Sequence, residues 1–453
     1  MVKPKRQFVC NTCGSVTLQW TGQCPSCHVW NTITEEIVSP SRAKVRADTG
    51  AMAFQSLVTD EDSPTSARHL TTVQEFDRVC GGGIVPGSVL LLGGDPGIGK
   101  STLLLQVSTK LIQAGKSIAY VSGEEAHDQI RLRAHRMGVE DIDMPLANST
   151  RMVEILSYLE KSPTLDVVVI DSIQTMHHED LDSAAGSVSQ VRHCAQELIR
   201  IAKTKNIAII LVGHVTKEGT LAGPRVLEHM VDTVLHFEGD RTHQFRILRG
   251  VKNRFGPTDE IGVFSMEAEG LAEVTNPSAL FLQERAHDAP GSCVFSGIEG
   301  TRPLLVEVQA LVQPTTMAVP RRSAVGYDVN RLNMILAVLE THAGYRFSDK
   351  EVYLNIVGGL RITEPAADIA IACALISAMV RVPLPSSVVM FGEIGLTGEI
   401  RRVSQAEKRL KEAQKLGFIK AIVPHKTTMN LKGISLHGLS NVGALRQVLA
   451  PSD

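Results

Sequence analysis

The segment Gly94-Asp95-Pro96-Gly97-Ile98-Gly99-Lys100-Ser101 limits the fold of this 453-residue chain more than any other feature of its sequence. It matches the phosphate-loop pattern Gly-x4-Gly-Lys-[Ser/Thr]. The apolar run 89–92 before it predicts a strand, and residues 102–112 after it predict a helix. In that setting the backbone N–H groups at the helix N-terminus can surround phosphate groups. The segment therefore predicts a nucleotide-binding α/β domain.

Each part of this loop has an expected role with ATP and Mg²⁺. Lys100 should reach the β- and γ-phosphates, and Ser101 should place its hydroxyl on the magnesium ion. The alternative is a purely structural glycine turn. The residues expected to bind the nucleotide are Gly94, Asp95, Pro96, Gly97, Ile98, Gly99, Lys100, Ser101 and Thr102.

Acidic residues at the ends of two further predicted strands complete this site. Asp171 ends the apolar run 167–170 and is the candidate second magnesium ligand, unless it only caps the next helix. Glu124 and Glu125 follow the predicted strand 118–121, where a carboxylate can polarise the attacking water. We favour Glu124 as the base, with Glu125 as alternate or helper. The other interpretation is an exposed acidic pair at a helix start.

Strand and helix signals alternate through residues 67–285, as in a nucleotide-binding core. Short, almost continuous apolar runs suit strands that are buried on both faces of a mostly parallel sheet. These runs are residues 88–92, 118–121, 167–170 and 207–212. Amphipathic stretches lie between them, for example 101–113 and 187–204.

Four of the eight cysteines lie close together near the N-terminus, in the pattern Cys-x2-Cys-x10-Cys-x2-Cys. They are Cys10, Cys13, Cys24 and Cys27. Two such pairs can close a tetrahedral zinc site, and four sulfur ligands leave no open position, so a structural ion is expected. A redox pair or unbound thiols are the alternatives. We predict a zinc finger over residues 1–30 and a linker over 31–66; the finger could contact DNA, dock a partner or only order the N-terminus.

Composition excludes several classes of protein. The net charge of −2, from 46 basic and 48 acidic residues, excludes a polycation, and 4% aromatic residues argue against a large base-stacking surface. No apolar run reaches the ~20 residues that span a bilayer. Residues 1–10 lack the apolar stretch of a signal peptide. We therefore expect a cytoplasmic protein with no membrane partner.

Several motifs together resemble a known family. The phosphate loop, SGEE at 122–125, VVVIDSIQT at 167–175 and KNRFG at 252–256 resemble the RecA-type ATPase core. The order of a four-cysteine finger, this core, KNRFG and a Lon-like C-terminal domain resembles the bacterial DNA repair family RadA, also called Sms, over essentially the whole chain. The resemblance implies a homohexameric, DNA-dependent ATPase that translocates on single-stranded DNA and processes branched recombination intermediates. It also suggests a recombinase as a candidate partner.

The resemblance also implies roles for further residues. Lys252 and Arg254 would project toward the nucleotide of a neighbouring subunit and stabilise charge on the transferred phosphoryl group; the alternative is a solvated strand end. Two loops would face DNA, 175–188 and 215–228. Lys217 and Arg225 in the second loop are candidate phosphate contacts.

Residues 304–453, after an expected connector at 286–303, resemble the α+β Lon protease domain through GEIGLTGEI at 392–400. A Lon-type peptidase needs a serine nucleophile and a lysine base. By this match Ala366 occupies the serine position and the lysine falls near Glu407. We therefore expect no peptidase activity, and a role in assembly or DNA binding instead.

The segment 401–432 contains nine basic and two acidic residues. A single-sign cluster on a nearly neutral protein favours contact with DNA phosphates, although a solvated helix face is the usual alternative. The candidate contacts are Arg401, Arg402, Lys408 and Arg409.

Three functions remain in view. The leading one is the DNA-translocating ATPase of recombinational repair. The second is an ATP-dependent peptidase, which the missing Ser/Lys pair disfavours. The third is a nucleotide-switched regulatory ATPase that binds protein partners.

Overall fold

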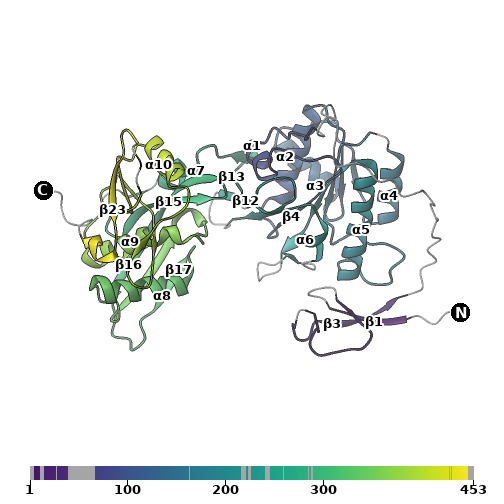
Figure 1. Cartoon of the computed structure of the whole chain (residues 1–453). Coiled ribbons are helices and arrows are strands. Elements are labelled where there is room, and N and C mark those ends of the chain that lie inside the picture. Colours follow the sequence, from purple (N-terminus) through teal and green to yellow (C-terminus); the bar gives the residue numbers. More distant parts are fainter. Residues whose placement is uncertain are drawn as a thin grey trace, which may run out of the picture. The chain divides into compact units, whose positions relative to one another are not determined.

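A computed structural model describes most of the chain, and this part forms two compact units, Met1–Glu273 and Val274–Asp453 (Figure 1). The described residues are 5–10, 15–26, 28–38, 67–162, 164–215, 221–222, 226–239, 245–258, 260–283, 285–286, 289–427, 429 and 431–446. Within these ranges no helix is both long enough and apolar enough to cross a membrane.

The N-terminal finger is a three-stranded antiparallel sheet in the order β2-β1-β3. Its strands are β1 (Lys5–Cys10), β2 (Val16–Thr17) and β3 (Ile33–Val38). Strand β3 pairs with the whole length of β1, from Lys5 opposite Val38 to Cys10 opposite Ile33. The predicted finger boundary at residue 30 was therefore wrong, because the fold needs this third strand.

The ATPase core is built on a nine-stranded sheet in the order β14-β13-β12-β11-β4-β8-β7-β5-β6. The strands from β11 to β6 are parallel to one another, and β12 to β14 add an antiparallel edge. The parallel strands are β4 (Val89–Gly94), β5 (Ile118–Ser122), β6 (Leu146–Asn148), β7 (Val167–Asp171), β8 (Ala208–Val212) and β11 (Thr233–Glu238). The antiparallel strands are β12 (Phe245–Asn253), β13 (Ile261–Glu267) and β14 (Gly270–Glu273). All four predicted apolar runs form central parallel strands, so the predicted sheet is confirmed.

Helices cover both faces of this sheet because alternate strand residues point to opposite sides. On one face, Leu90 and Leu92 pack with helices α1 (Gln74–Val79), α2 (Lys100–Gln113) and α3 (His127–Arg136). On the other face, Val89 and Leu91 pack with α4 (Met152–Lys161), α5 (Val188–Lys205) and α6 (Val226–Met230). Short strands β9 (His214–Val215) and β10 (Leu221–Ala222) pair with each other. Two apolar layers thus hold the parallel strands in place.

The second unit contains a mixed seven-stranded sheet in the order β17-β18-β16-β15-β19-β22-β23. These strands are β15 (Ser292–Glu299), β16 (Arg302–Pro314), β17 (Arg322–Val325), β18 (Lys350–Ile356), β19 (Val388–Met390), β22 (Lys420–Pro424) and β23 (Ser435–Leu439). A smaller pair is formed by β20 (Glu393–Ile394) and β21 (Ile400–Arg401). The helices are α7 (Pro277–Leu282), α8 (Val329–Val338), α9 (Asp368–Val380) and α10 (Ala406–Lys415). The sheet and helices confirm an α+β domain.

The boundary between the two units differs from the expected one. Residues 286–303, expected as a connector, contain β15 and the start of β16, which form a hairpin inside the second sheet. Cys293, Val294 and Phe295 are fully buried there. Helix α7 lies against β16 and belongs to the same unit. The second unit therefore begins at residue 274, well before the predicted start at 304.

Candidate functional site

The phosphate loop connects β4 to α2, as the sequence predicts, and its shape depends on two glycines. Gly94 and Gly99 have φ angles of 155° and 114°. A Cβ atom on Gly94 would lie 2.4 Å from the carbonyl oxygen of Phe237, and one on Gly99 would lie 2.9 Å from Cε of Met266. Glycine is therefore required at Gly94 by backbone conformation and by space, and at Gly99 by backbone conformation, since the end of the Met266 side chain can move.

Lys100 is buried and bends back over the loop. Its Nζ donates to the carbonyl oxygens of Gly94 at 2.7 Å and Asp95 at 3.0 Å. Burial lowers the pKa of Lys100, while the nearby carboxylates of Asp171 and Glu124 act in the opposite direction. The lysine thus lies among the acidic residues that the sequence assigned to the same site.

Asp171 and Ser101 come together at the carboxyl-end edge of the parallel strands. The Ser101 hydroxyl donates to the Asp171 carboxylate, and the Tyr120 hydroxyl donates to Asp171 Oδ2 at 2.7 Å. Burial raises the pKa of Asp171, against the effect of these two hydrogen bonds. A hydroxyl and a carboxylate are oxygen donors that suit Mg²⁺. The predicted magnesium ligands therefore fit the ion in kind and in position.

The two adjacent glutamates have different surroundings. Ser172 Oγ donates to the carboxylate of Glu124. Glu125 instead accepts two hydrogen bonds from Arg133, of 2.8 and 2.6 Å. Both oxygens of Glu125 are therefore engaged by one guanidinium, whereas Glu124 faces the side where Lys100 and Asp171 lie.

KNRFG lies at the opposite end of the strands from the phosphate loop, where the parallel strands begin. Asn253, at the end of β12, pairs with Thr233, and Thr233 pairs with Leu90 near the start of β4. The phosphate loop begins four residues further along β4, which corresponds to roughly 13 Å. The structure therefore does not bring Lys252 or Arg254 to the phosphate loop of their own chain.

Lys252 and Arg254 both bind their own chain at that end of the strands. Lys252 Nζ donates to the carbonyl oxygens of Glu228 at 2.7 Å and Val231 at 2.8 Å, around the end of α6. Arg254 Nη1 donates to Asp232 Oδ1 at 3.1 Å, although 54% of the Arg254 side chain is exposed. Lys252 thus secures the backbone, and Arg254 is the more accessible of the two cations.

The finger contains half of the predicted zinc ligands within the described residues. Cys10 and Cys24 are buried, while Cys13 and Cys27 lie outside the described residues. The Ser26 N–H lies 3.4 Å from Cys24 Sγ, and Thr32 Oγ1 lies 3.2 Å from Cys10 Sγ. A backbone donor aimed at sulfur, as Ser26 offers to Cys24, suits a thiolate that binds a metal ion. These two side chains therefore fit a zinc ion.

The candidate DNA contacts divide into three groups. Lys217 and Arg225 lie outside the described residues. Arg402 and Lys408 are exposed, whereas Arg401 is exposed but paired with Glu399. Contact of Arg401, Arg402 and Lys408 with DNA remains a prediction.

The prediction that Arg409 contacts DNA was wrong, because only 1% of its side chain is exposed. Its guanidinium makes two hydrogen bonds to Glu364, of 3.1 and 2.6 Å, and another to the Ser296 carbonyl oxygen at 2.8 Å. It also lies over the ring of Phe391. Arg409 is thus part of the interior of the second unit.

The Lon-like positions carry no serine–lysine pair. Ala366 is buried, and Glu407 is 58% exposed and paired with Lys411 at 2.6 Å. Neither side chain is a hydroxyl nucleophile or an amine base. The expectation of no peptidase activity stays a prediction, with these positions in its support.

Sequence reasoning missed three residues of the phosphate site. Tyr120 was included only as part of an apolar strand, and Ser172 follows Asp171 without a pattern of its own. Arg246, on β12, donates through Nε to the carbonyl oxygen of Ile98 at 3.2 Å. The partners of these residues are distant in sequence, so no local motif could have identified them.

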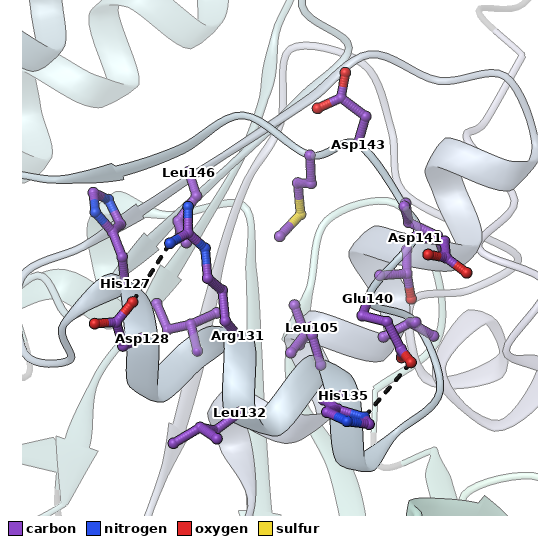
Figure 2. A pocket seen from close by; sticks show the side chains of 16 residues that line it. Leu105, His127, Asp128, Arg131, Leu132, His135, Glu140, Asp141, Asp143 and Leu146 are labelled. Carbon is purple, nitrogen blue, oxygen red and sulfur yellow. Dashed lines mark hydrogen bonds and ion pairs between the residues drawn. The ribbon is translucent and has the colours of Figure 1, made fainter.

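A separate cavity lies elsewhere in the ATPase core. Its volume is about 870 Å³, and it lies among α2, α3 and the segment that leads to β6. Figure 2 shows the ion pairs Asp128–Arg131 and His135–Glu140 on its wall. No residue of the phosphate loop lines it. This cavity is therefore distinct from the phosphate site.

Models of known protein families match three parts of the chain. Residues 8–35 match the family described as rubredoxin metal binding domain, residues 61–220 match an AAA domain, and residues 311–427 match subunit ChlI of Mg-chelatase. A solved structure of the RadB recombinase, 22% identical, covers 46% of this chain and 99% of its own, with a TM-score of 0.38.

Two relatives extend over nearly the whole chain. The DNA repair protein RadA of Brucella abortus is 55% identical over 436 residues, which is 94% of this chain and 93% of the relative. RadA of Bacillus subtilis is 49% identical over 99% of this chain and 100% of its own length. With such identities over almost the full length of both partners, this chain belongs to the RadA family of DNA repair proteins.

Proposed function

We propose that this chain is a DNA-dependent ATPase of recombinational repair. It processes branched recombination intermediates by ATP-driven translocation on single-stranded DNA. The observation that carries the enzymatic part is the meeting of Lys100, Ser101 and Asp171 at one end of the parallel strands. Membership of a family of DNA repair proteins supports the DNA part.

Each residue at this end of the strands has a separate role in phosphoryl transfer. Lys100 exchanges its hydrogen bonds to Gly94 and Asp95 for bonds to the phosphates. Ser101 and Asp171 would hold Mg²⁺, which would supply positive charge against the charge that develops on the phosphoryl oxygens. Glu124 orients the attacking water and accepts its proton. Glu125 is unsuited to this role because Arg133 engages both of its oxygens.

The second part of the site comes from a neighbouring subunit. Because KNRFG lies at the far end of the strands, Arg254 can reach a nucleotide only in another copy of the chain. In a homohexameric ring, Arg254 of one subunit stabilises charge at the site of the next, and Lys252 secures the strand end that carries it. The Arg254→Ala variant should therefore bind nucleotide normally and fail to hydrolyse it.

The second unit serves the ring as a scaffold and not as a peptidase. Ala366 and Glu407 offer neither a serine nucleophile nor a lysine base, whereas Arg402 and Lys408 offer exposed positive charge to DNA. Casein incubated with the protein and ATP should stay intact. Release of peptides from casein would favour the ATP-dependent peptidase instead.

The deciding experiment measures steady-state ATP hydrolysis with and without single-stranded DNA at one fixed salt concentration, since phosphate contacts weaken steeply with salt. We expect stimulation by DNA that disappears in Lys100→Ala, followed by movement of branched DNA junctions that requires ATP. Hydrolysis that is indifferent to DNA, in protein confirmed to carry zinc, would contradict the proposal.

One observation favours a second candidate, the nucleotide-switched regulatory ATPase. The two tryptophans of the chain, Trp20 and Trp30, are 61% and 65% exposed on the finger, and exposed tryptophan is typical of surfaces that bind other proteins. This candidate gains weight if hydrolysis ignores DNA but responds to a purified partner protein.

A further inference from the structure

The turn that carries Arg254 lies against a second turn that is distant in sequence. Residues 254–256 follow β12, and residues 80–83 follow α1. A Cβ atom on Gly256 would lie 3.0 Å from Cα of Gly81, so the two backbones are in direct contact. The Asn253 side chain closes the first turn by accepting the N–H of Phe255 at 2.9 Å. The position of Arg254 therefore depends on the contact between these two turns.

Arg68 ties the two turns together. Its Nη2 donates to the carbonyl oxygen of Phe255 at 2.6 Å, and its Nη1 donates to the carbonyl oxygen of Gly81 at 2.6 Å. Nη1 also lies 3.3 Å from the carbonyl oxygen of Cys80. A planar guanidinium can serve both turns at once because its donors point in fixed, diverging directions, which an ammonium group cannot reproduce.

Asp232 holds the same turn from the other side. Its Oδ1 accepts from Arg254 Nη1, and its carbonyl oxygen accepts from the Arg254 N–H at 3.1 Å. Its Oδ2 accepts from Lys203 Nζ at 2.7 Å and from the Val89 N–H at 3.0 Å, which joins it to α5 and β4. The turn is therefore anchored to the rigid sheet on one side and clamped by Arg68 on the other.

We propose that Arg68 is a positioning residue for the ATPase reaction of the neighbouring subunit. It fixes the turn 254–256 and so the direction in which Arg254 leaves its own subunit. This role rests on the proposed action of Arg254 across a subunit boundary. Arg68 itself lies at the end of the strands opposite the phosphate loop and touches neither the nucleotide of its own subunit nor the reacting atoms.

The Arg68→Ala variant should separate turnover from binding. A misplaced catalytic cation lowers kcat on the order of 10- to 100-fold. KM for ATP should stay within about twofold, because the variant's own phosphate loop is unchanged. Arg68→Lys should recover only part of the loss, since it keeps the charge but bridges the two turns poorly. Arg78→Ala, which removes a more exposed arginine from the nearby α1, is the matched control and should retain the wild-type rate.

Subunit mixing tests whether the effect crosses the subunit boundary. Lys100→Ala has a defective phosphate loop and an intact turn, whereas Arg68→Ala has the reverse. Oligomers formed from equal amounts of the two should regain up to about one quarter of the wild-type rate, the share of sites at which an intact loop faces an intact turn. Arg254→Ala mixed with Lys100→Ala in the same way is the reference.

Each result has a distinct meaning. Recovery in both mixtures supports Arg68 as the positioning residue. Recovery in the Arg254 mixture alone overturns the role of Arg68 and leaves the proposed function intact. Recovery in neither mixture overturns the action across subunits, and the role of Arg68 with it. If Arg68→Ala does not fold, as judged by thermal denaturation, Arg68→Lys takes its place in the mixture with the same expected pattern.

Discussion

Asp232 brings donors from three parts of the ATPase core to one buried carboxylate. Burial by itself raises the pKa of Asp232, but the hydrogen bonds from Lys203 and Val89 outweigh this effect and leave the pKa below its ordinary value. A carboxyl group with a lowered pKa in the folded state stabilises the fold at pH values above its ordinary pKa of about 3.9. This stabilisation is lost as the pH falls through the lower, folded-state value.

We therefore predict that Asp232→Asn lowers the free energy of unfolding near pH 7 by about 2 kcal/mol, because hydrogen bonds to a charged acceptor are lost. The difference from wild type should shrink as the pH is lowered below about 4, through the lowered pKa of the folded state. Urea denaturation at a series of pH values measures both effects. Asp128→Asn, at a carboxylate that is 89% exposed, is the control and should change little. A difference that does not depend on pH would contradict the assignment.

Arg409 and Lys408 are neighbours in α10 with opposite surroundings, and they give a matched pair of variants. Removing Arg409 leaves Glu364 without its main partner, so Arg409→Ala should destabilise the second unit by about 3–5 kcal/mol. Lys408→Ala should leave stability unchanged within about 0.5 kcal/mol and weaken binding of DNA. Thermal denaturation and a DNA-binding titration at fixed salt distinguish the two. Equal stability of both variants would contradict the buried ion pair.

Functional residues could be predicted from the sequence only where the chemistry requires a fixed spacing along the chain. The phosphate loop and Asp171 could be predicted because each follows directly after a predicted strand. Arg409 was wrongly predicted to contact DNA because its charge suggested exposure. It lies three residues after Ala406 and four before Ala413, and therefore on the face of α10 that packs inward. The difference between Glu124 and Glu125 depends on Arg133 and Ser172, and no local pattern in the sequence reveals these contacts.

At the scale of elements, one glutamine holds a segment that is expected to face DNA. Gln190, on α5, is buried, and its amide donates to the carbonyl oxygens of His178, Leu181 and Ser183 at 3.0–3.1 Å. Its Oε1 accepts the N–H of His178 at 2.8 Å. The segment 178–183 therefore has a fixed shape, which depends on a side chain outside it.

We predict that Gln190→Ala frees this segment without unfolding α5. Amide hydrogen exchange over residues 178–183 should quicken by about tenfold or more, which corresponds to the loss of one to two hydrogen bonds. Gln196→Ala, at an exposed position on the same helix, is the control and should leave the exchange rates unchanged. Unaltered protection in Gln190→Ala would show that other contacts hold the segment.

Element prediction succeeded for buried parallel strands and failed for the hairpin of β15 and β16. The apolar runs 167–170 and 207–212 have a single reasonable interpretation, because both faces of such strands are buried. Residues 286–303 contain three glycines and two prolines, a composition typical of turns. Here the pairing of β15 with β16 overrides that local preference, and tertiary contacts of this kind cannot be read from one segment.

At the scale of the whole molecule, the finger and the ATPase core have separate hydrophobic cores. The described part of the finger buries Cys10, Cys24 and Ile33, with Phe8 packed against them. Such a small core cannot offset the entropy of ordering the sheet without a metal ion. The ATPase core has two large apolar clusters of its own. Stability of the finger should therefore depend on zinc, and stability of the core should not.

We predict that removal of zinc with a chelator, or the change Cys10→Ser, unfolds the finger alone. Limited proteolysis should cleave within residues 5–38, while the thermal transition of the ATPase core and its hydrolysis without DNA stay within error of wild type. Metal analysis gives the ratio of zinc to protein. An unchanged ratio in Cys10→Ser would exclude Cys10 as a ligand.

The place of Arg68 in the chain has a practical consequence for anyone who wishes to isolate the ATPase core. The described core begins at residue 67, and His69 pairs with Ile84 through two backbone hydrogen bonds of 2.8 and 2.9 Å. A fragment cut to begin at residue 69 keeps every motif of the phosphate site and the pairing of His69 with Ile84, and still loses Arg68. Such a fragment should fold and bind nucleotide but hydrolyse ATP slowly. The slow hydrolysis would reflect the loss of the residue that positions Arg254 toward neighbouring copies, and not a defect in the phosphate site.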